Sequence, residues 1–315
     1  MKMFHLWSAF LLLTLCQAVT AAEGLLVDES RQINANEKIV IDVMRGKVTV
    51  RGSASTTFRV RGRLDELAEG FELNSASGFT RFEVKMPRFN NRRADEGSDL
   101  EFEVPAGADI QINGINTAVD ISDLSGASTE ISSVNGHIDA SNLNGLIEIS
   151  TVNGRISSSD NRGKIELSTV NGQIDDRQSE GRLSFSAING SINVDSTAQE
   201  ARLSVVNGEV EARLQGIEDL QFSTVNGPVS LTLTDSVEPR IKGSSVSATI
   251  VLNLDTDISA RFSIRSNAGG TIINGLTEDP VVRAEYGPAR SLQFSVGEGA
   301  GIVELNSVSG RIEIR

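Results

Sequence analysis

The sequence is nearly free of the residues on which cross-links, metal sites and aromatic packing depend. Of 315 residues, one is cysteine, two are histidine, one is tryptophan, one is tyrosine and six are proline. A single cysteine excludes an internal disulfide, and zinc sites of the cysteine–histidine type need about four such ligands. A chain without disulfides has to be held together by a large hydrophobic core instead.

Basic residues are also scarce. The chain has 29 Lys and Arg residues against 42 Asp and Glu residues, a net charge of −13. Binding to a phosphate backbone requires clustered positive charge, so we expect no nucleic-acid partner. Such an acidic surface also repels anionic membrane surfaces.

The apolar run near the N-terminus is too short for a membrane span, which needs about 20 apolar residues. Lys2 precedes an apolar stretch at 6–16, and Thr20, Ala21 and Ala22 supply small residues before Glu23. This order is typical of a secretory signal, so we expect residues 1–22 to be removed and the protein to be periplasmic, on the cell surface or extracellular. A membrane anchor is the alternative.

Removal of the signal would leave a chain with even fewer basic, cysteine and histidine residues. Lys2 and the only cysteine, Cys16, lie within it, so the remaining chain would have a net charge of −14 and no thiol. One histidine, His137, would remain, which makes a histidine-based catalytic site or metal site hard to build. We expect no cofactor and no metal.

One short motif is abundant. An Asn-Gly pair recurs at intervals of 18 or 19 residues, and the residues around it fall into columns. The asparagine column is Asn135, Asn153, Asn171, Asn189, Asn207 and Asn226; the serine column is Ser132, Ser150, Ser168, Ser186, Ser204 and Ser223. Apolar columns start at Ile131, Val134 and Ile138, and a late copy carries Ser309 in place of the asparagine. An exact period of this kind indicates a repeat architecture.

Two architectures fit the period. Asn-Gly is a strong hairpin signal, so the chain could be an antiparallel meander. Alternatively, each period is one coil of a parallel stack and Asn-Gly is a corner. A meander would expose the column of Val134, Val152 and Val170, whereas a coil that bends near Ser168 and again at Asn-Gly can point it inward. We therefore predict an all-β, single-stranded parallel β-helix or β-solenoid with coils of roughly 18 residues and an N-terminal β cap.

Stacking explains the polar columns as well. Successive coils lie about 4.8 Å apart, so identical side chains would lie above one another. Stacked asparagine amides and serine hydroxyls can then form ladders of hydrogen bonds. A ligand-binding role for the asparagine ladder is the alternative to this structural role.

The sequence divides into four segments: the signal at 1–22, a β-rich cap at 23–108, regular repeats at 109–231, and a degenerate continuation at 232–315. In the cap, Arg88, Arg92 and Arg93 form the one basic cluster, which is either a solvated loop tip or a contact for an anion or glycan. The chain ends in RIEIR, and we predict that this last strand is an uncovered edge open to a partner or to self-association.

The segment VPAGADIQI at 104–112 and the repeated STVNG motif resemble the bacterial "putative adhesin" family of β-strand-repeat domains, which is defined largely as a domain of unknown function. The resemblance covers roughly residues 38–315. It implies a β-helix-like fold and an exported or envelope location. The family name implies surface binding, but the motif consists of core and corner residues and supplies no binding residue.

Catalytic motifs are absent, since the chain has neither a GxSxG elbow nor a phosphate loop. Asp139, Asp175 and Glu211 share one outward column, and Asp175 with Asp176 forms a second carboxylate pair. We expect these acidic groups to keep the surface soluble and to be fully solvated.

We therefore expect an exported, non-catalytic binding or structural module of the cell envelope, with an envelope protein or a glycan as partner. The alternatives are an enzyme that acts on polysaccharides through the outward carboxylates, and a scaffold in envelope-stress signalling that works through the C-terminal edge.

Overall fold

The computed structural model describes residues 25–87 and 97–315, and within them the chain is all β, with no helix. The predicted signal at 1–22 and the cluster of Arg88, Arg92 and Arg93 lie outside the described residues. No described segment forms a helix long and apolar enough to cross a membrane. The strands are β1 (Leu26–Gln32), β2 (Lys38–Ser53), β3 (Thr57–Arg63), β4 (Gly70–Ala76), β5 (Phe79–Lys85), β6 (Ser98–Pro105), β7 (Asp109–Leu124), β8 (Ser128–Asn135), β9 (Ile138–Asn153), β10 (Ile156–Ser159), β11 (Arg162–Asn171), β12 (Ile174–Asn189), β13 (Ile192–Asn207), β14 (Val210–Gln215), β15 (Asp219–Asn226), β16 (Val229–Thr234), β17 (Arg240–Asn253), β18 (Ala260–Ser266), β19 (Thr271–Asn274), β20 (Val282–Arg283), β21 (Arg290–Val296) and β22 (Gly301–Ile314).

Strands in the repeat region pair in parallel with the strands one period away. Ser168 of β11 is aligned with Ser150 of β9 on one side and with Ser186 of β12 on the other. The same offset aligns Ile156 with Ile174. Equivalent residues of successive periods therefore stack directly on one another, as the parallel alternative predicts and the antiparallel meander does not.

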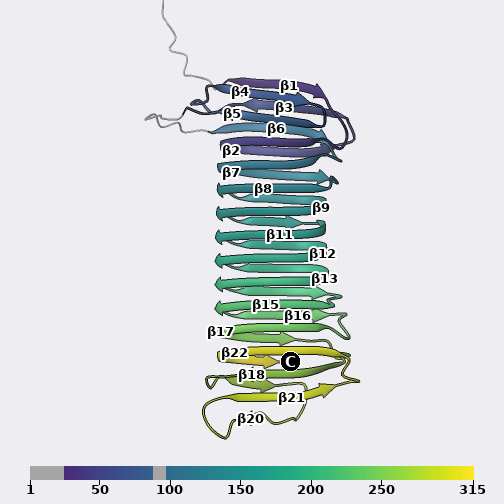
Figure 1. The fold of residues 1–315 in the computed structure, drawn as a ribbon, viewed down its shortest axis with the longest axis vertical. Helices are drawn as coiled ribbons and strands as arrows, with labels where there is room; N and C mark the ends of the chain where they lie inside the picture. The colour runs from purple at the N-terminus through teal and green to yellow at the C-terminus, as the bar shows by residue number, and fades with distance from the viewer. Residues whose placement is uncertain (1–24, 88–96) are drawn as a thin grey trace, which may run out of the picture.

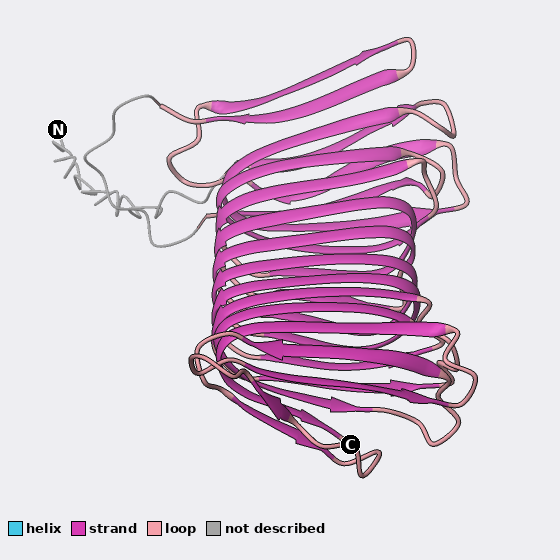
Figure 2. Ribbon diagram, turned by 60° about the horizontal axis from the view of Figure 1, so that its bottom comes forward, coloured by secondary structure: helices cyan, strands magenta, loops and turns pink. Residues whose placement is uncertain are grey.

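The stacked strands form two faces of an elongated body (Figures 1 and 2). We call the face that carries the serine column the serine face; it comprises 128–135, 146–153, 164–171, 182–189, 200–207 and 219–226. After each Asn-Gly corner the chain continues on the opposite face, which comprises 138–143, 156–159, 174–177, 192–197, 210–215 and 229–234. A return corner then leads back to the serine face.

The core lies between the two faces. On the serine face, Ile165, Leu167 and Thr169 are buried, while Glu166 and Ser168 between them point outward. Ile174 is buried from the opposite face. This alternation is the ordinary period of two of a β-strand, and each buried aliphatic side chain contributes about 1.5–3 kcal/mol.

Glycine follows each asparagine because the stacked corners bring backbones into contact. A Cβ atom on Gly172 would overlap the carbonyl oxygen of Gly154, and one on Gly154 would overlap the carbonyl oxygen of Gly136. Close approach of adjacent coils thus excludes every other residue type at this position.

The aliphatic column beside the corner is solvent-exposed, so its predicted inward orientation is wrong. Val134, Val152 and Ile188 expose 40%, 39% and 43% of their surfaces, and Val170 is half-buried. The strand does not bend near Ser168, so the alternation continues to the corner. The preceding residue of each coil, such as Thr169 or Ala187, is buried instead.

At the N-terminal end, the first complete coil is covered by later parts of the chain. β2 pairs in parallel with β7 below it and with β5 and β6 above it. β4 then pairs antiparallel with β5, and β3 and β1 add two antiparallel strands beyond β6. The segment at 23–108, predicted to be a β-rich cap, contains β1 to β6.

The C-terminal end repeats this arrangement, which contradicts the prediction of an uncovered final strand. β22 pairs in parallel with β17 on one side and with β18 and β19 on the other. The antiparallel strands β21 and β20 lie beyond β18. The sequence did not reveal that the chain passes the position of its last coil and then returns to fill it (Figure 1).

Two isoleucines of the final strand point inward, as alternation in RIEIR predicts, whereas Glu313, predicted to point outward to solvent, is buried beneath its arginine neighbours. Ile312 and Ile314 are buried, while Arg311 and Arg315 are exposed and donate hydrogen bonds to Glu313. The hydrogen bonds from Arg315 and then Arg311 lower the pKa of Glu313. Because β22 is paired along both edges, neither a partner nor a second copy can add a strand to it.

Aromatic side chains fill the two ends of the body. Phe82 packs edge-on against Phe102 with ring centroids 5.2 Å apart, and Phe58 lies 6.0 Å from Phe102. At the other end Phe262 stacks on Phe294 at 4.4 Å. The regular coils between them have mainly aliphatic cores, with Phe185 and Phe222 as the buried rings there, so most buried phenylalanines lie near the two ends.

Candidate functional site

Three adjoining hollows lie in a row along the serine face. Their volumes are about 310, 420 and 380 Å³. The first and second share Glu166 and Ser184, and the second and third share Arg202 and Gln221. Together they form one shallow polar track across the coils from Glu130 to Asn306, which we call the serine groove.

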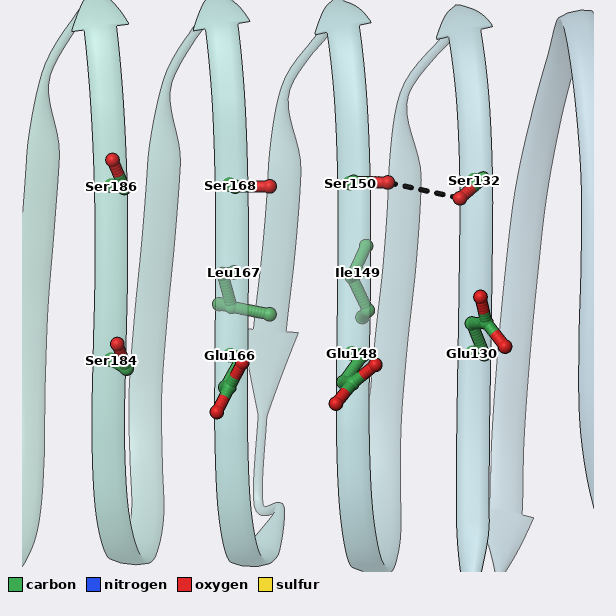
Figure 3. A pocket seen from close by; sticks show the side chains of 10 residues that line it. All are labelled: Glu130, Ser132, Glu148, Ile149, Ser150, Glu166, Leu167, Ser168, Ser184 and Ser186. Carbon is green, nitrogen blue, oxygen red and sulfur yellow. Dashed lines mark hydrogen bonds between the residues drawn. The ribbon is translucent and has the colours of Figure 1, made fainter.

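Two columns of outward side chains line the first part of the groove (Figure 3). One consists of serines, and the other consists of Glu130, Glu148, Glu166 and Ser184. Both columns point outward because they alternate with the buried Ile149 and Leu167 along each strand. The groove therefore presents the same hydroxyl group once per coil, about every 4.8 Å.

The charge of the groove changes along its length. Glu130, Glu148 and Glu166 make the first hollow acidic, and the Nζ atom of Lys164 lies 2.5 Å from a carboxylate oxygen of Glu166. Beyond it, the guanidinium of Arg182 pairs with Glu200 at 3.2 Å across one coil. Such exposed ion pairs add little to stability, so these side chains can exchange partners with a ligand.

The serine hydroxyls are only partly used within the protein. The Oγ atoms of Ser132 and Ser150 are 3.0 Å apart, and Ser223 donates to Ser204 at 3.1 Å. Ser168 and Ser186 have no side-chain hydrogen bond to another described residue. The expected continuous serine ladder is therefore interrupted, and hydroxyls in its middle remain available to a ligand.

The asparagine column forms an unbroken ladder at the corner. Each amide nitrogen donates to the amide oxygen of the preceding coil, at 2.8 Å from Asn153 to Asn135 and 2.9 Å from Asn171 to Asn153. Asn116, outside the repeat recognised in the sequence, extends the ladder at one end, and Asn226 ends it at the other. Each amide inside the ladder thus donates one hydrogen bond and accepts one, which fixes its orientation and gives the column the structural role expected for it.

The outward carboxylates on the opposite face are engaged with neighbouring side chains. Asp175 accepts hydrogen bonds from Gln173 at 2.7 Å and Asn193 at 2.9 Å, and Arg155 lies 3.4 Å away. Glu211 pairs with Arg213 at 2.6 Å, and His137 lies 3.6 Å from Asp139. Neighbouring side chains therefore occupy these carboxylates within the protein.

Asp176 is buried, contrary to the expectation that it is an outward, solvated carboxylate. Burial raises its pKa, which hydrogen bonds from Ser158, Ser179 and Ser196 partly offset. It points inward because it is two residues after Ile174, on the same side of the strand. Counting that alternation from Ile174 would have identified the buried position in the sequence.

A buried polar cluster surrounds this carboxylate, and sequence reasoning did not identify it. Asn161 is fully buried; it accepts a hydrogen bond from the backbone of Leu143 at 2.8 Å and donates to Ser158 at 2.9 Å. Ser158 in turn reaches Asp176. The cluster is packed inside the return corner, so it is structural and does not open into the serine groove.

No protein-family model matches the chain, and no curated protein matches it either. Solved structures of similar arrangement include a "putative adhesin" from Parabacteroides distasonis, with 14% identity and a TM-score of 0.45 over 74% of this chain and 96% of that one. A "putative adhesin" from Bacteroides fragilis has 13% identity and a TM-score of 0.40 over 93% and 99%. A "putative lipid binding protein" from Parabacteroides distasonis has 14% identity and a TM-score of 0.33 over 75% and 96%.

Among the described residues, no three or more His, Cys, Asp or Glu side chains are grouped closely enough to hold a metal ion. The serine groove is lined by hydroxyl, carboxylate, guanidinium, ammonium and amide groups. Its chemistry is that of hydrogen bonding along a line, repeated from coil to coil.

Proposed function

We propose that this protein is an exported, non-catalytic β-solenoid that acts as a binding module of the cell envelope, and that its serine groove holds an extended polar polymer such as a glycan. The observation that carries the proposal is the continuity of the groove over successive coils. A linear polymer can contact such a surface at many equivalent points.

The hydrogen-bonding groups of the groove support a polyhydroxylated ligand. Ser168 and Ser186 offer hydroxyls that can both donate and accept, and Glu148 and Arg202 add an acceptor and a donor at either side. Each contact is weak by itself, and their number along the chain supplies the affinity. The single-stranded solenoid arrangement is inferred from the parallel register of equivalent residues.

The arrangement of carboxylates favours binding over catalysis. Asp139 and Asp175 are separated by two coils, roughly 9.6 Å, at the upper limit of about 9.5 Å for an inverting glycosidase pair. The carboxylate of Asp175 also accepts a hydrogen bond from Asn193 and lies 3.4 Å from Arg155, so neighbouring side chains of the protein already occupy it.

Export rests on the sequence of residues 1–22, and the envelope is where an exported polymer-binding module meets glycans. The scaffold alternative depended on an uncovered C-terminal strand, and β22 is paired along both edges. It therefore has no support from the fold.

The proposal can be tested by measuring binding of the full chain to purified envelope glycans and peptidoglycan. We expect at least one polymer to bind and the variant Ser168→Arg with Ser186→Arg to reduce its affinity by about tenfold or more, since two bulky side chains would fill the first hollow. The matched control places the same substitutions on the opposite face, as Ser159→Arg with Thr232→Arg, and should bind normally. Absence of binding to every polymer, or equal loss in both variants, would reject the groove as a binding site.

The same samples separate binding from catalysis. Chain-length analysis of each polymer after prolonged incubation should show no shortening. Shortening that Asp175→Asn abolishes would instead establish the enzymatic alternative.

A further inference from the structure

The exposed aliphatic column continues well beyond the recognised repeats. The strand register aligns one residue from each of ten coils along the edge between the serine face and the Asn-Gly corner. We call this set the aliphatic ridge: Met44, Ile115, Val134, Val152, Val170, Ile188, Val206, Val225, Val246 and Val308. At about 4.8 Å per coil, it is roughly 43 Å long.

The ridge is apolar and open to solvent along its whole length. Nine of its members expose between 37% and 46% of their surfaces, and Val170 is half-buried. Isolated exposed aliphatic residues are ordinary on a soluble protein, whereas a contiguous row of ten is not. Because fold stability does not require these side chains to be aliphatic, their repetition points to a contact with another molecule.

From Ile115 to Val308 the ridge also lies in a long uncharged strip of an acidic molecule; only Met44 at its end has charged neighbours in the two flanking columns, Asp42 and Arg45. The column on its serine side contains only serine and asparagine from Asn113 to Asn306, and the column on its corner side contains only asparagine and serine from Asn116 to Ser309. The chain as a whole is 23% charged with a net charge of −13. Two copies can therefore meet along this strip without placing like charges in contact.

The spacing of the ridge selects the kind of partner. A straight row with a repeat of about 4.8 Å stays in register over ten coils only with a partner of the same repeat. A second copy of this chain has that repeat, the same length and the same uncharged borders. We propose that the protein forms a homodimer in which the aliphatic ridges of two copies pack against each other about a two-fold axis.

The available area is sufficient for such a dimer. With about 40% of each residue exposed, ten side chains present on the order of 600 Å² per copy, so the pair would bury on the order of 1,200 Å². This value is at the lower end of stable interfaces, and the flanking asparagine column would add to it. A two-fold arrangement uses the same surface on both copies, as most homodimers do.

The first test is the molar mass of the full chain by sedimentation or light scattering at tens of micromolar. We expect a dimer, and a monomer throughout this range would overturn the proposal. Val152→Asp with Val206→Asp places charges on the ridge and should weaken dimerisation by at least about 100-fold, because a buried unpaired charge is costly. The matched control, Ser159→Asp with Thr232→Asp, adds the same charge on the opposite face and should remain dimeric.

Cross-linking identifies the surface directly. In a chain whose Cys16 is replaced by serine, Val170→Cys places one thiol near the middle of the ridge, and Asp195→Cys places one on the opposite face. A short bifunctional maleimide should link copies through position 170 and not through position 195. Linking through 195 alone, or a dimer that the ridge charges leave intact, would contradict the proposal.

This inference is independent of the proposed polymer binding. The polymer test changes Ser168 and Ser186 in the groove, and the dimer test changes Val152 and Val206 on the ridge. A protein that dimerises without binding a polymer, or binds a polymer as a monomer, would separate the two conclusions.

Discussion

Each coil reverses direction at two corners, and the two corners are stabilised by different side chains. At the Asn-Gly corner the residues are nearly identical in every coil, and the asparagines hydrogen-bond to one another on the outside. At the return corner the residues vary, and polar side chains point inward to bind backbone amides, as Asn161 binds Leu143 and Ser236 binds Ile217. The first corner is thus conspicuous as a sequence repeat, whereas the second repeats only a glycine, as at Gly145, Gly163 and Gly181.

Backbone geometry accounts for this difference. At the Asn-Gly corner adjacent backbones touch, so only glycine fits and the asparagines have to stack in register. At the return corner Asn142, Asp160 and Gln178 adopt left-handed conformations with φ of 53°, 56° and 56°. Polar residues of several kinds tolerate that region, and one coil can satisfy its amides with side chains from the next. The return corner keeps glycine only at its one point of close contact between coils, where a Cβ atom on Gly163 or Gly181 would overlap the carbonyl oxygen of the preceding coil. Its other positions vary because side chains can be accommodated there.

The largest difference in stability between variants of the two corners should come from adding one methyl group at each corner. Gly172→Ala places a Cβ against the carbonyl of Gly154, and we expect it to lower the free energy of unfolding by about 3 kcal/mol or more. Gly216→Ala lies at the return corner, where φ is +71° and no atom lies within 4 Å, so it should cost only about 1 kcal/mol. Urea unfolding measures both, and equal losses would mean that contact between coils does not define the Asn-Gly corner.

Removal of one asparagine from each corner should give the next largest difference. Asn161→Ala leaves a buried amide of Leu143 and the hydroxyl of Ser158 without their partner, for a loss of about 2–3 kcal/mol. Asn171→Ala removes two ladder hydrogen bonds in contact with water, for about 1 kcal/mol. Thermal unfolding of the two variants compares these losses of stability. A larger loss of stability for Asn171→Ala than for Asn161→Ala would contradict the greater contribution of the buried return corner.

The smallest expected effect depends on pH and concerns the buried cluster near the return corner. Burial raises the pKa of Asp176 in the folded state, so the folded protein holds this proton more tightly than the unfolded chain. Stability should therefore fall as the pH rises from below about 3.9 through the raised folded pKa. Asp176→Asn removes this dependence, and we expect it to be more stable than the parent at neutral pH.

The difference in the free energy of unfolding between Asp176→Asn and the parent should become smaller as the pH is lowered. Urea unfolding at several pH values would measure it. Asp175→Asn is the matched control, because its carboxylate is paired with Arg155 at the surface. A gap that widens at low pH would contradict the burial of an Asp176 carboxyl group with a raised pKa.

The sequence predicted the parts of the fold that depend on local periodicity. The equal spacing of residues such as Asn153 and Asn171 was enough to predict parallel stacking. Strand alternation was enough to predict that Ile312 and Ile314 are buried. The orientation of Val152 was mispredicted because uniform apolar character was taken as a sign of burial. The same column is uniform because it forms an exposed ridge.

Local sequence patterns could not predict which strands pair when they lie far apart in the sequence. Nothing near β22 shows that β18 and β19 will cover it, because that pairing depends on where the chain goes after Asn253. The serine groove could be predicted in part, since Ser168 and Glu166 both lie on outward positions. The interruption of its hydrogen bonds between Ser150 and Ser204 depends on side-chain rotation, which spacing does not determine.

The most direct test of the parallel stack is one distance between spin labels on the serine face. Labels at Ser132 and Ser244 lie six coils apart, so the account predicts a backbone separation of about 29 Å. An antiparallel meander would put twice as many strands between them and give about 58 Å. Pulsed electron spin resonance resolves both values, and a distance near the longer one would contradict the stacking of equivalent residues.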